Sequence, residues 1–170
     1  MSKLSLGRGL IIAVAVVSIV VPVGVDGLLY ANAHMQNPLW LPHAKLHTAM
    51  SFHAAIALGA GSLALLAARW RRPERADLAI TAFLATAFWA GLVLAGLWPG
   101  TAYFFAQDPA FADMSRPVIL GLTIDPNAAL AVVCVIVGWL GFVLAASGLK
   151  STRPDTYRPR GAARVEATKG

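Results

Sequence analysis

The sequence predicts an all-α integral membrane protein: a bundle of four transmembrane helices with both termini in the cytoplasm. Three observations predict it: 58% of the 170 residues are hydrophobic, only 13% are charged, and the apolar residues form four long runs. A soluble domain carries about 25% charged residues. A chain with so few polar groups needs lipid as the solvent for its outer face, and helices cross lipid because they satisfy their own backbone hydrogen bonds.

The four apolar runs have the length of transmembrane helices. They cover about residues 9–30, 46–68, 78–98 and 127–149. About 20 helical residues cross a hydrocarbon core roughly 30 Å thick. The first run is preceded by Lys3 and Arg8, as a signal peptide would be, but it is too long for one and ends without a cleavage pattern. We therefore expect a transmembrane domain over residues 1–150 and a basic, disordered tail over residues 151–170.

The distribution of positive charge predicts the orientation. Twelve of the fourteen Lys and Arg residues lie in the two terminal tails and in the link between the second and third runs, and the other two connections hold only Lys45 and Arg116. Basic connections stay in the cytoplasm. We therefore expect residues 31–45 and 99–126 on the outer face of a multi-pass protein of the cell's inner (plasma) membrane. The net charge of +6 flanks apolar runs, which argues against nucleic-acid binding.

Cysteine usage excludes several kinds of site. The single cysteine, Cys134, lies inside an apolar run. One thiol allows no internal disulfide, no CxxC redox pair and no cysteine-rich zinc or iron–sulfur centre. A buried lone cysteine is most often an apolar filler.

Local signals predict helix ends and close contacts. Asp125 before Pro126 is typical of an N-cap followed by proline at the first helical position. Pro42 suits the start of the second helix for the same reason. Four glycines in the third and fourth runs are expected to permit close helix packing. These are Gly91, Gly96, Gly138 and Gly141.

All four histidines lie within residues 33–53, near the predicted outer surface. They are His34, His43, His47 and His53. If the second helix begins at Pro42, the second and third histidines share a face one turn apart. His53 then lies within the same arc of about 120°. Histidine has a pKa near neutrality and suits acid–base chemistry.

Asp26 is a carboxylate in the last turns of the first apolar run, where charged residues are rare, face inward and are usually functional. It is followed at i+4 and i+8 by Tyr30 and His34, so the three line one face if the helix persists that far. The short connection predicts that the first two helices are antiparallel neighbours, which would let Asp26 face His47 or His53. We predict Asp26, His47 and His53 as catalytic residues and Tyr30 and His34 as ligand-binding residues.

Each of these residues also has a purely structural interpretation. Asp26 lies only one or two turns from the interface and follows Pro22 and Gly24, so it fits a hydrated carboxylate. The histidines fit interfacial groups, or groups that merely form hydrogen bonds between helices.

Residues 37–47 read N-P-L-W-L-P-H-A-K-L-H. This segment resembles a signature of a family of small bacterial and fungal four-helix membrane proteins, N-P-x-W-P-P-H-A-[RK]-F-H, which lies between their first two helices. The chain departs from the signature at Leu41 and Leu46, where the family has Pro and Phe. The resemblance covers these eleven residues and the helix layout.

The resemblance implies that Asn37, Trp40, His43 and His47 act together, and it adds the first three to the expected ligand-binding residues. It implies no activity. The layout alone is also similar to the sterol-isomerase and sigma-receptor-like four-helix proteins, which bind apolar ligands inside a bundle. No shared motif supports that second similarity, so it is an analogy of architecture.

Three functions stay open at this point. The first is binding of a small lipid-like molecule, or action on it by proton transfer. The second is an accessory subunit of a larger membrane complex, or a homo-oligomer, because the last two apolar runs carry no histidine. The third is a metal or haem site, with His43 and His47 as ligands and His34 or Asp26 completing it. The sequence requires no cofactor, since H-E-x-x-H and C-x-x-C-H motifs are absent.

Overall fold

The computed structural model describes residues 1–103 and 117–149. The predicted disordered tail, residues 151–170, and Arg116 lie outside this part of the chain. The described part is mostly helical. Its elements are α1 (Lys3–Val21), the π-helical η1 (Pro22–Leu29), the 3₁₀-helical η2 (Ala31–Ala33), α2 (Pro42–Ala68), α3 (Arg75–Ala95), β1 (Val118–Ile119), β2 (Leu122–Thr123) and α4 (Pro126–Ser147).

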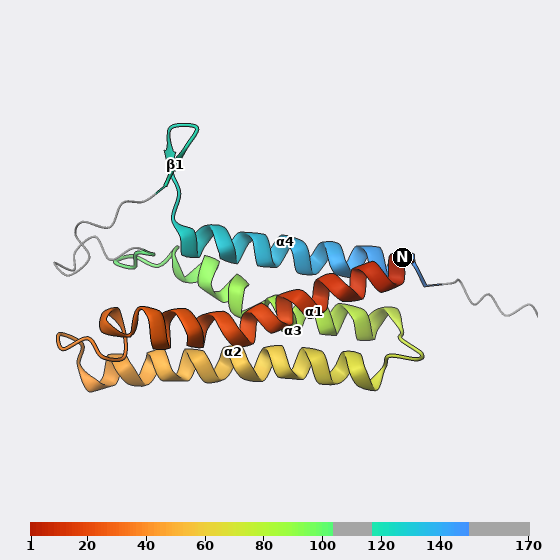
Figure 1. Cartoon of the computed structure of the whole chain (residues 1–170), viewed down its shortest axis with the longest axis horizontal. Helices are drawn as coiled ribbons and strands as arrows, with labels where there is room; N and C mark the ends of the chain where they lie inside the picture. Colours follow the sequence, from red (N-terminus) through yellow and green to blue (C-terminus); the bar gives the residue numbers. More distant parts are fainter. Residues whose placement is uncertain (104–116, 150–170) are drawn as a thin grey trace, which may run out of the picture.

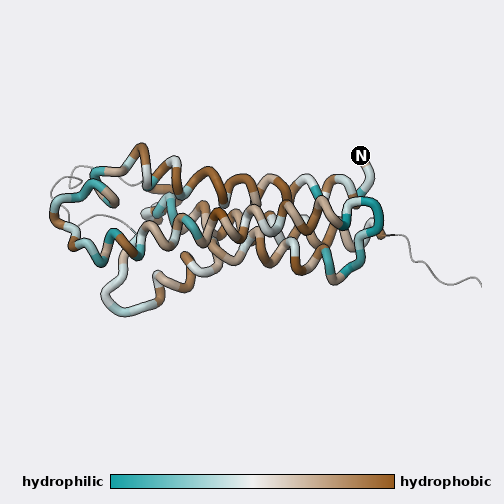
Figure 2. Tube along the Cα trace, turned by 90° about the horizontal axis from the view of Figure 1, so that it is seen from below, coloured by the Kyte–Doolittle hydropathy of each residue, from teal (hydrophilic) through white to brown (hydrophobic). Residues whose placement is uncertain are grey.

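Within the described residues, four helices are long and apolar enough to cross a membrane: Lys3–Leu29, Pro42–Ala68, Arg75–Ala95 and Pro126–Ser147. The prediction of a mainly helical chain with four membrane-length helices is therefore confirmed. The first three helices begin several residues before the apolar runs do, because a helix continues through polar residues until a cap ends it. In Figure 2 hydrophobic residues dominate the middle of the bundle and hydrophilic residues gather at its two ends.

The four long helices pack in a ring, and Figure 1 shows them lying along the long axis of the bundle. Each long helix packs against its neighbour in sequence, α1 closes the ring against α4, and α1 also contacts α3 across the bundle. The start of α1 lies beside the end of α4, because the backbone of Leu4 closely approaches Gly148. The η1–η2 segment, the start of α2, the end of α3 and the start of α4 lie at the opposite end.

A two-stranded hairpin precedes α4 and was not expected in an all-α chain. Val118 pairs with Thr123, and Ile119 pairs with Leu122. The connecting residues Leu120 and Gly121 have φ values of 53° and 79°, the left-handed backbone that a tight two-residue hairpin turn requires. The hairpin is too short to alter the helical architecture.

The predicted caps are confirmed. α2 begins at Pro42. Asp125 caps α4, where its Oδ1 accepts hydrogen bonds from the backbone N–H of Asn127 at 2.9 Å and of Ala128 at 3.1 Å. These contacts satisfy donors that have no partner inside the helix.

Glycines allow the helices to approach each other closely where the backbone or a side chain of a neighbouring helix faces them. A Cβ atom on Gly141 would lie 2.8 Å from the carbonyl oxygen of Gly7, and one on Gly138 would overlap the Thr86 side chain. The expected packing role is confirmed for these two glycines. Gly96 instead packs against the side chain of Tyr103, and a Cβ atom on Gly91 would meet nothing within 4 Å.

Buried polar groups link helices inside the bundle. The Trp89 indole N–H donates to the Ser18 hydroxyl at 2.7 Å, and that hydroxyl lies 2.9 Å from the carbonyl oxygens of both Val14 and Ala85. α1 and α3 are thereby joined by a fully satisfied buried network, which fixes their relative position.

Arg8 is buried at the end of the bundle that holds the N-terminus. Only 7% of the surface of this residue is exposed. Its Nη2 donates to the Trp70 carbonyl at 2.7 Å, and its guanidinium carbon lies 4.5 Å from the centre of the Trp70 ring. This contact ties the link between α2 and α3 to α1, so the expectation that Arg8 is simply a flanking charge misses a structural role.

Candidate functional site

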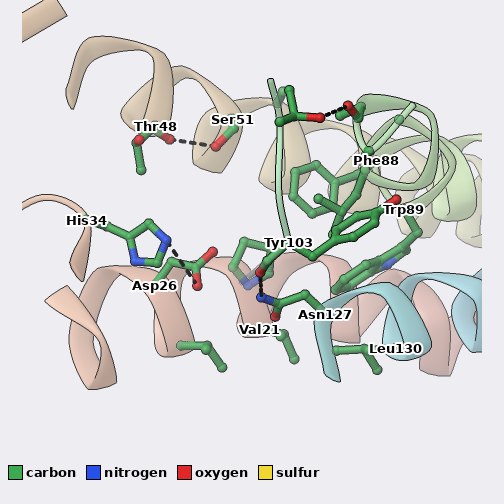
Figure 3. Close-up of a pocket in the computed structure, with 18 of the residues that line it drawn as sticks. Val21, Asp26, His34, Thr48, Ser51, Phe88, Trp89, Tyr103, Asn127 and Leu130 are labelled. Carbon is green, nitrogen blue, oxygen red and sulfur yellow. Dashed lines mark hydrogen bonds and ion pairs between the residues drawn. The ribbon is translucent and has the colours of Figure 1, made fainter. Parts of the chain in front are cut away.

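A cavity of about 640 Å³ opens among the four helices at the end of the bundle opposite the N-terminus (Figure 3). Its walls come from the end of α1, η1, α2, α3, the segment after α3 and the start of α4. Small-molecule sites in proteins have volumes of about 300–1,000 Å³, and their walls are mainly apolar with a few polar groups. The cavity therefore has the size and composition of a ligand site.

The lining changes from polar to apolar along the bundle axis. On α2 the lining residues nearest the end of the bundle are Thr48 and Ser51, and the deeper ones are Ala54 and Leu58. At 1.5 Å per residue this row spans about 15 Å. The deep wall is completed by side chains from α3 and α4, among them Phe88, Trp89, Leu92 and Leu130. An elongated molecule with one polar end would match this gradient.

Asp26 and His34 point toward each other at the polar end of the cavity (Figure 3). His34 Nε2 lies 3.9 Å from Asp26 Oδ1, and the two side chains are 16% and 34% exposed. This separation is longer than a hydrogen bond, so the two groups interact as an ion pair or through a group placed between them. The ring of His34 also packs edge-on against Trp40, with ring centres 5.5 Å apart.

A backbone contact orients the His34 ring. His34 Nδ1 lies 3.1 Å from the carbonyl oxygen of Tyr30. A carbonyl oxygen can only accept, so Nδ1 is the protonated nitrogen in this contact. Nε2 is then the nitrogen that exchanges a proton, and it is the one that faces Asp26. This arrangement of carboxylate and imidazole is suited to proton transfer.

The backbone around Asp26 departs from the α-helix on which the sequence interpretation relied. From Pro22 to Leu29 the chain is π-helical, and the Tyr30 N–H donates to the Val25 carbonyl five residues earlier at 2.7 Å. Pro22 has no N–H and its ring crowds the preceding turn, which favours a wider turn after it. π-helical turns are frequent at functional sites.

The wider turns change which residues meet. The expected row of Asp26, Tyr30 and His34 does not form as one α-helical face, and the side chain of Tyr30 is exposed while its carbonyl holds His34. His34 follows η2 and folds back toward Asp26. The structure thus brings Asp26 and His34 together through a turn and not through helical spacing.

The expected partners of Asp26 on α2 lie elsewhere. Of the described residues, those that line the cavity from this part of α2 are Thr48 and Ser51, not His47 or His53. His53 is exposed, and its Nδ1 lies 2.7 Å from the carbonyl oxygen of Ala49. A change of one residue turns the helix by about 100°, and this rotation places the two histidines outside the cavity.

The residues from the family signature divide into three groups. Trp40 lines the cavity beside His34. Asn37 is buried and shapes the loop, since its Oδ1 accepts from the Leu39 N–H at 2.9 Å and its Nδ2 donates to the Ala33 carbonyl at 3.3 Å. His43 and His47 form an exposed pair at the start of α2, with their Nε2 atoms 3.0 Å apart.

Three further polar residues line the cavity. The sequence analysis did not single them out as site residues. Tyr103 donates from its hydroxyl to the Val93 carbonyl at 2.8 Å, Asn127 donates to the Tyr103 carbonyl at 3.4 Å, and Thr101 donates to the Ala95 carbonyl at 2.8 Å. They close the cavity between α3 and α4. Tyr103 and Asn127 lie 24 residues apart, and no motif in the sequence connects them.

Among residues 1–103 and 117–149, no group of three or more His, Cys, Asp and Glu side chains is arranged to hold a metal ion. The four-ligand arrangement expected of a closed structural zinc site is therefore not formed by the described side chains alone. His43 and His47 supply two converging nitrogens, and the proposed completion by His34 or Asp26 is not formed, since those two residues pair with each other at the cavity.

Fold and site together define a class: a small bundle of four membrane-length helices with an amphipathic cavity at one end and a carboxylate–imidazole pair in its polar part. Comparison of the chain with protein-family models, curated proteins and solved structures gives no match. The resemblance of residues 37–47 to the family signature stays a prediction.

Proposed function

We propose that this chain is a multi-pass membrane protein that binds a small lipid-like molecule with a neutral polar head. The observation that carries the proposal is the cavity of about 640 Å³, polar around Asp26 and His34 and apolar toward Trp89 and Leu130. The apolar part of the ligand would lie against the deep wall. Burial of each CH₂ group there would contribute about 0.8 kcal/mol.

The pairing of Asp26 with His34 favours a neutral head. When the pair holds one proton in addition to the one on His34 Nδ1, it carries no net charge: the proton lies on Nε2 and the two charges cancel, or it lies on Asp26 and both groups are neutral. In either state the pair offers one donor and one acceptor side by side. The two atoms lie 3.9 Å apart, so a hydroxyl group placed beside them could accept from one partner and donate to the other, whereas a carbonyl group could only accept from the protonated partner. A ligand with a full charge would have to displace one of them.

The same arrangement supports proton transfer as a second step. His34 Nε2 would accept the proton of a bound hydroxyl group, or donate one to a bound carbonyl oxygen, and Asp26 would stabilise the imidazolium. A positioned acid–base group of this kind contributes about 10²–10⁴-fold to a rate. Binding comes first, so binding is the property to measure first.

The proposed orientation places the cavity on the outer side of the plasma membrane and both termini in the cytoplasm. The start of α1 and the end of α4 lie together, and the basic link between α2 and α3 is held to α1 by Arg8. Six of the seven Lys and Arg residues in the described part of the chain, all but Lys45, thus lie at the end opposite the cavity, as cytoplasmic retention of basic segments predicts. In intact cells an impermeant maleimide should label Leu39→Cys and spare Ser2→Cys; the reverse pattern would invert the topology.

The test of binding uses farnesol, a branched fifteen-carbon alcohol, as the probe. The full chain is purified, transferred to lipid nanodiscs and titrated by calorimetry against empty nanodiscs. We expect saturable binding with one farnesol per chain. Asp26→Asn and His34→Gln should weaken it at least tenfold, because a hydrogen bond to a charged group contributes about 1.5–3 kcal/mol and tenfold corresponds to about 1.4 kcal/mol.

His53→Gln is the matched control, because it changes an exposed histidine that does not line the cavity. It should leave farnesol affinity unchanged, and thermal unfolding should confirm that all variants remain folded. Native mass spectrometry of the purified wild type supplies an independent readout of any small molecule that is retained. If farnesol does not bind and a constant protein partner is retained in place of a small molecule, the accessory-subunit interpretation replaces this proposal.

A further inference from the structure

The first two turns of α2 carry two exposed imidazole rings whose Nε2 atoms face each other. His43 Nε2 and His47 Nε2 lie 3.0 Å apart, and the rings are perpendicular, with centres 4.5 Å apart. Pro42 begins the helix and thereby sets the two residues one turn apart on the same face. Both side chains are open to solvent.

We propose that His43 and His47 form a chelating site for a divalent first-row transition-metal ion such as Zn²⁺, Ni²⁺ or Cu²⁺. Neither residue is among those that line the cavity, so this site is separate from the proposed lipid-like ligand. Imidazole nitrogen binds these ions in preference to Mg²⁺ or Ca²⁺, which favour oxygen.

The distance between the nitrogens is the one that a single ion requires. Zinc–nitrogen bonds are about 2.0–2.1 Å long. Two such bonds at a right angle place the nitrogens about 2.9 Å apart, and two at a tetrahedral angle place them about 3.4 Å apart. The observed 3.0 Å lies between these values, so an ion could enter with only a small rotation of the two rings.

Without a metal, the same contact is a hydrogen bond in which one Nε2 carries a proton and the other accepts it. Metal binding needs both Nε2 atoms unprotonated, so the proton moves to Nδ1 of its own ring, which points away from the partner. No net charge is lost from the neutral pair in this exchange. Lys45 lies two residues after His43, and residues at i and i+2 do not face each other on a helix, so its charge is directed elsewhere.

Two histidines leave the remaining coordination positions to water. Among the described side chains no third ligand completes the group, so the proposed site is an open one. Open sites bind more weakly than the closed four-ligand sites that stabilise folds. They also leave room for a ligand from solution or from another molecule at this surface.

The test uses full-length protein purified through an affinity tag that contains no histidine, in detergent and without chelator. Isothermal titration with Zn²⁺ should give one ion per chain, and a parallel titration with Mg²⁺ should give no saturable binding. His43→Ala and His47→Ala should each lower Zn²⁺ affinity at least tenfold, because a single imidazole cannot chelate. Saturating Zn²⁺ should raise the Tm of the wild type and leave the Tm of both variants unchanged.

His53→Ala is the matched control, because it removes an exposed histidine of the same helix that contacts its own backbone and, within residues 1–103 and 117–149, no second ring. It should keep the stoichiometry and affinity of the wild type. Absence of saturable Zn²⁺ binding in the wild type, or wild-type affinity in His43→Ala or His47→Ala, would overturn the proposal and leave the pair as a hydrogen bond at the start of α2. Farnesol binding is measured separately, so loss of either site is recognised independently of the other.

Discussion

The two ends of the bundle are built from similar residues and differ in what faces them. At the end that holds the N-terminus, Gly7 and Gly141 oppose each other's backbones, and any added Cβ atom would clash. At the other end, Gly91 lines a cavity and a Cβ atom there would meet nothing within 4 Å. A glycine in a helix therefore indicates a close contact only where a neighbouring backbone or side chain lies opposite it.

The charged residues also differ between the close-packed end and the end that holds the cavity. Arg8 is enclosed, with its guanidinium held by the Trp70 carbonyl and ring. Asp26 and His34 stand 3.9 Å apart at a cavity. A buried charge with fixed partners secures structure, whereas a pair with a gap beside open space has room for a ligand. The end that holds the N-terminus therefore holds the helices together, and the other end has space for the proposed ligand.

The largest effect is expected from a change at the close-packed end. Gly7→Ala adds a Cβ atom that would overlap the Gly141 carbonyl oxygen and the Ala145 backbone, so α1 and α4 must separate. Overpacking of this kind costs about 1–3 kcal/mol and occasionally more, and we expect the upper end because the obstacle is backbone. Thermal and denaturant unfolding in detergent would measure the loss of stability.

The matched control is Gly9→Ala, two residues along the same helix. A Cβ atom there meets nothing within 4 Å, and alanine is favoured over glycine in helices by about 0.8–1 kcal/mol. It should keep or raise the Tm. Similar unfolding curves for the two variants would show that α1 and α4 do not approach as closely as this structure has them.

A smaller effect is expected in the middle of the bundle, where Trp89 lines the cavity and also forms a hydrogen bond with Ser18 of α1. Ser18→Ala leaves the buried Trp89 N–H without the acceptor that now lies 2.7 Å away. An unsatisfied buried donor costs about 1–3 kcal/mol. Because Trp89 also lines the cavity, farnesol affinity should fall together with stability, as measured by unfolding and calorimetry.

Ser147→Ala provides the comparison for this variant. Its hydroxyl donates to the Leu144 carbonyl at 2.9 Å at an exposed site, where water can replace the lost partner. Stability should change by less than about 0.5 kcal/mol, as for most surface substitutions. If Ser18→Ala were equally mild, the network between α1 and α3 would not be a source of rigidity.

The four long helices were predictable because each depends on one strong feature of the sequence, a long apolar run. Runs of about 20 apolar residues have few other solutions in lipid, and Pro42 and Asp125 fixed two helix starts through local chemistry. The burial of Arg8 was not predictable in this way. Its contact with Trp70 joins residues 62 positions apart, and only the packing of α1 against the α2–α3 link brings them together.

The composition of the site was predictable only in part. Asp26 stood out because charge inside an apolar run is rare, and the structure places it in the lining of the cavity. Which residues of α2 lie near Asp26 depends on which side of each helix faces the inside of the bundle. An almost wholly apolar helix carries little amphipathic pattern to set that face, so nothing in the sequence separates Thr48 and Ser51 from His47. The π-helical turns after Pro22 then altered the spacing that linked Asp26 to His34.

A small gain in stability, and the clearest separation of the two ends, is expected at Gly91. Gly91→Ala should raise stability by up to about 1 kcal/mol, because alanine is the better helix former and a Cβ atom meets no neighbour within 4 Å. Gly91→Leu should stay folded and weaken farnesol binding, since its side chain would take space from the cavity that Gly91 lines. Unfolding and calorimetry on both variants would separate folding from binding at this position. A loss of stability in Gly91→Ala comparable to that of Gly7→Ala would mean that both ends are close-packed, and the cavity on which ligand binding depends would not exist in the folded protein.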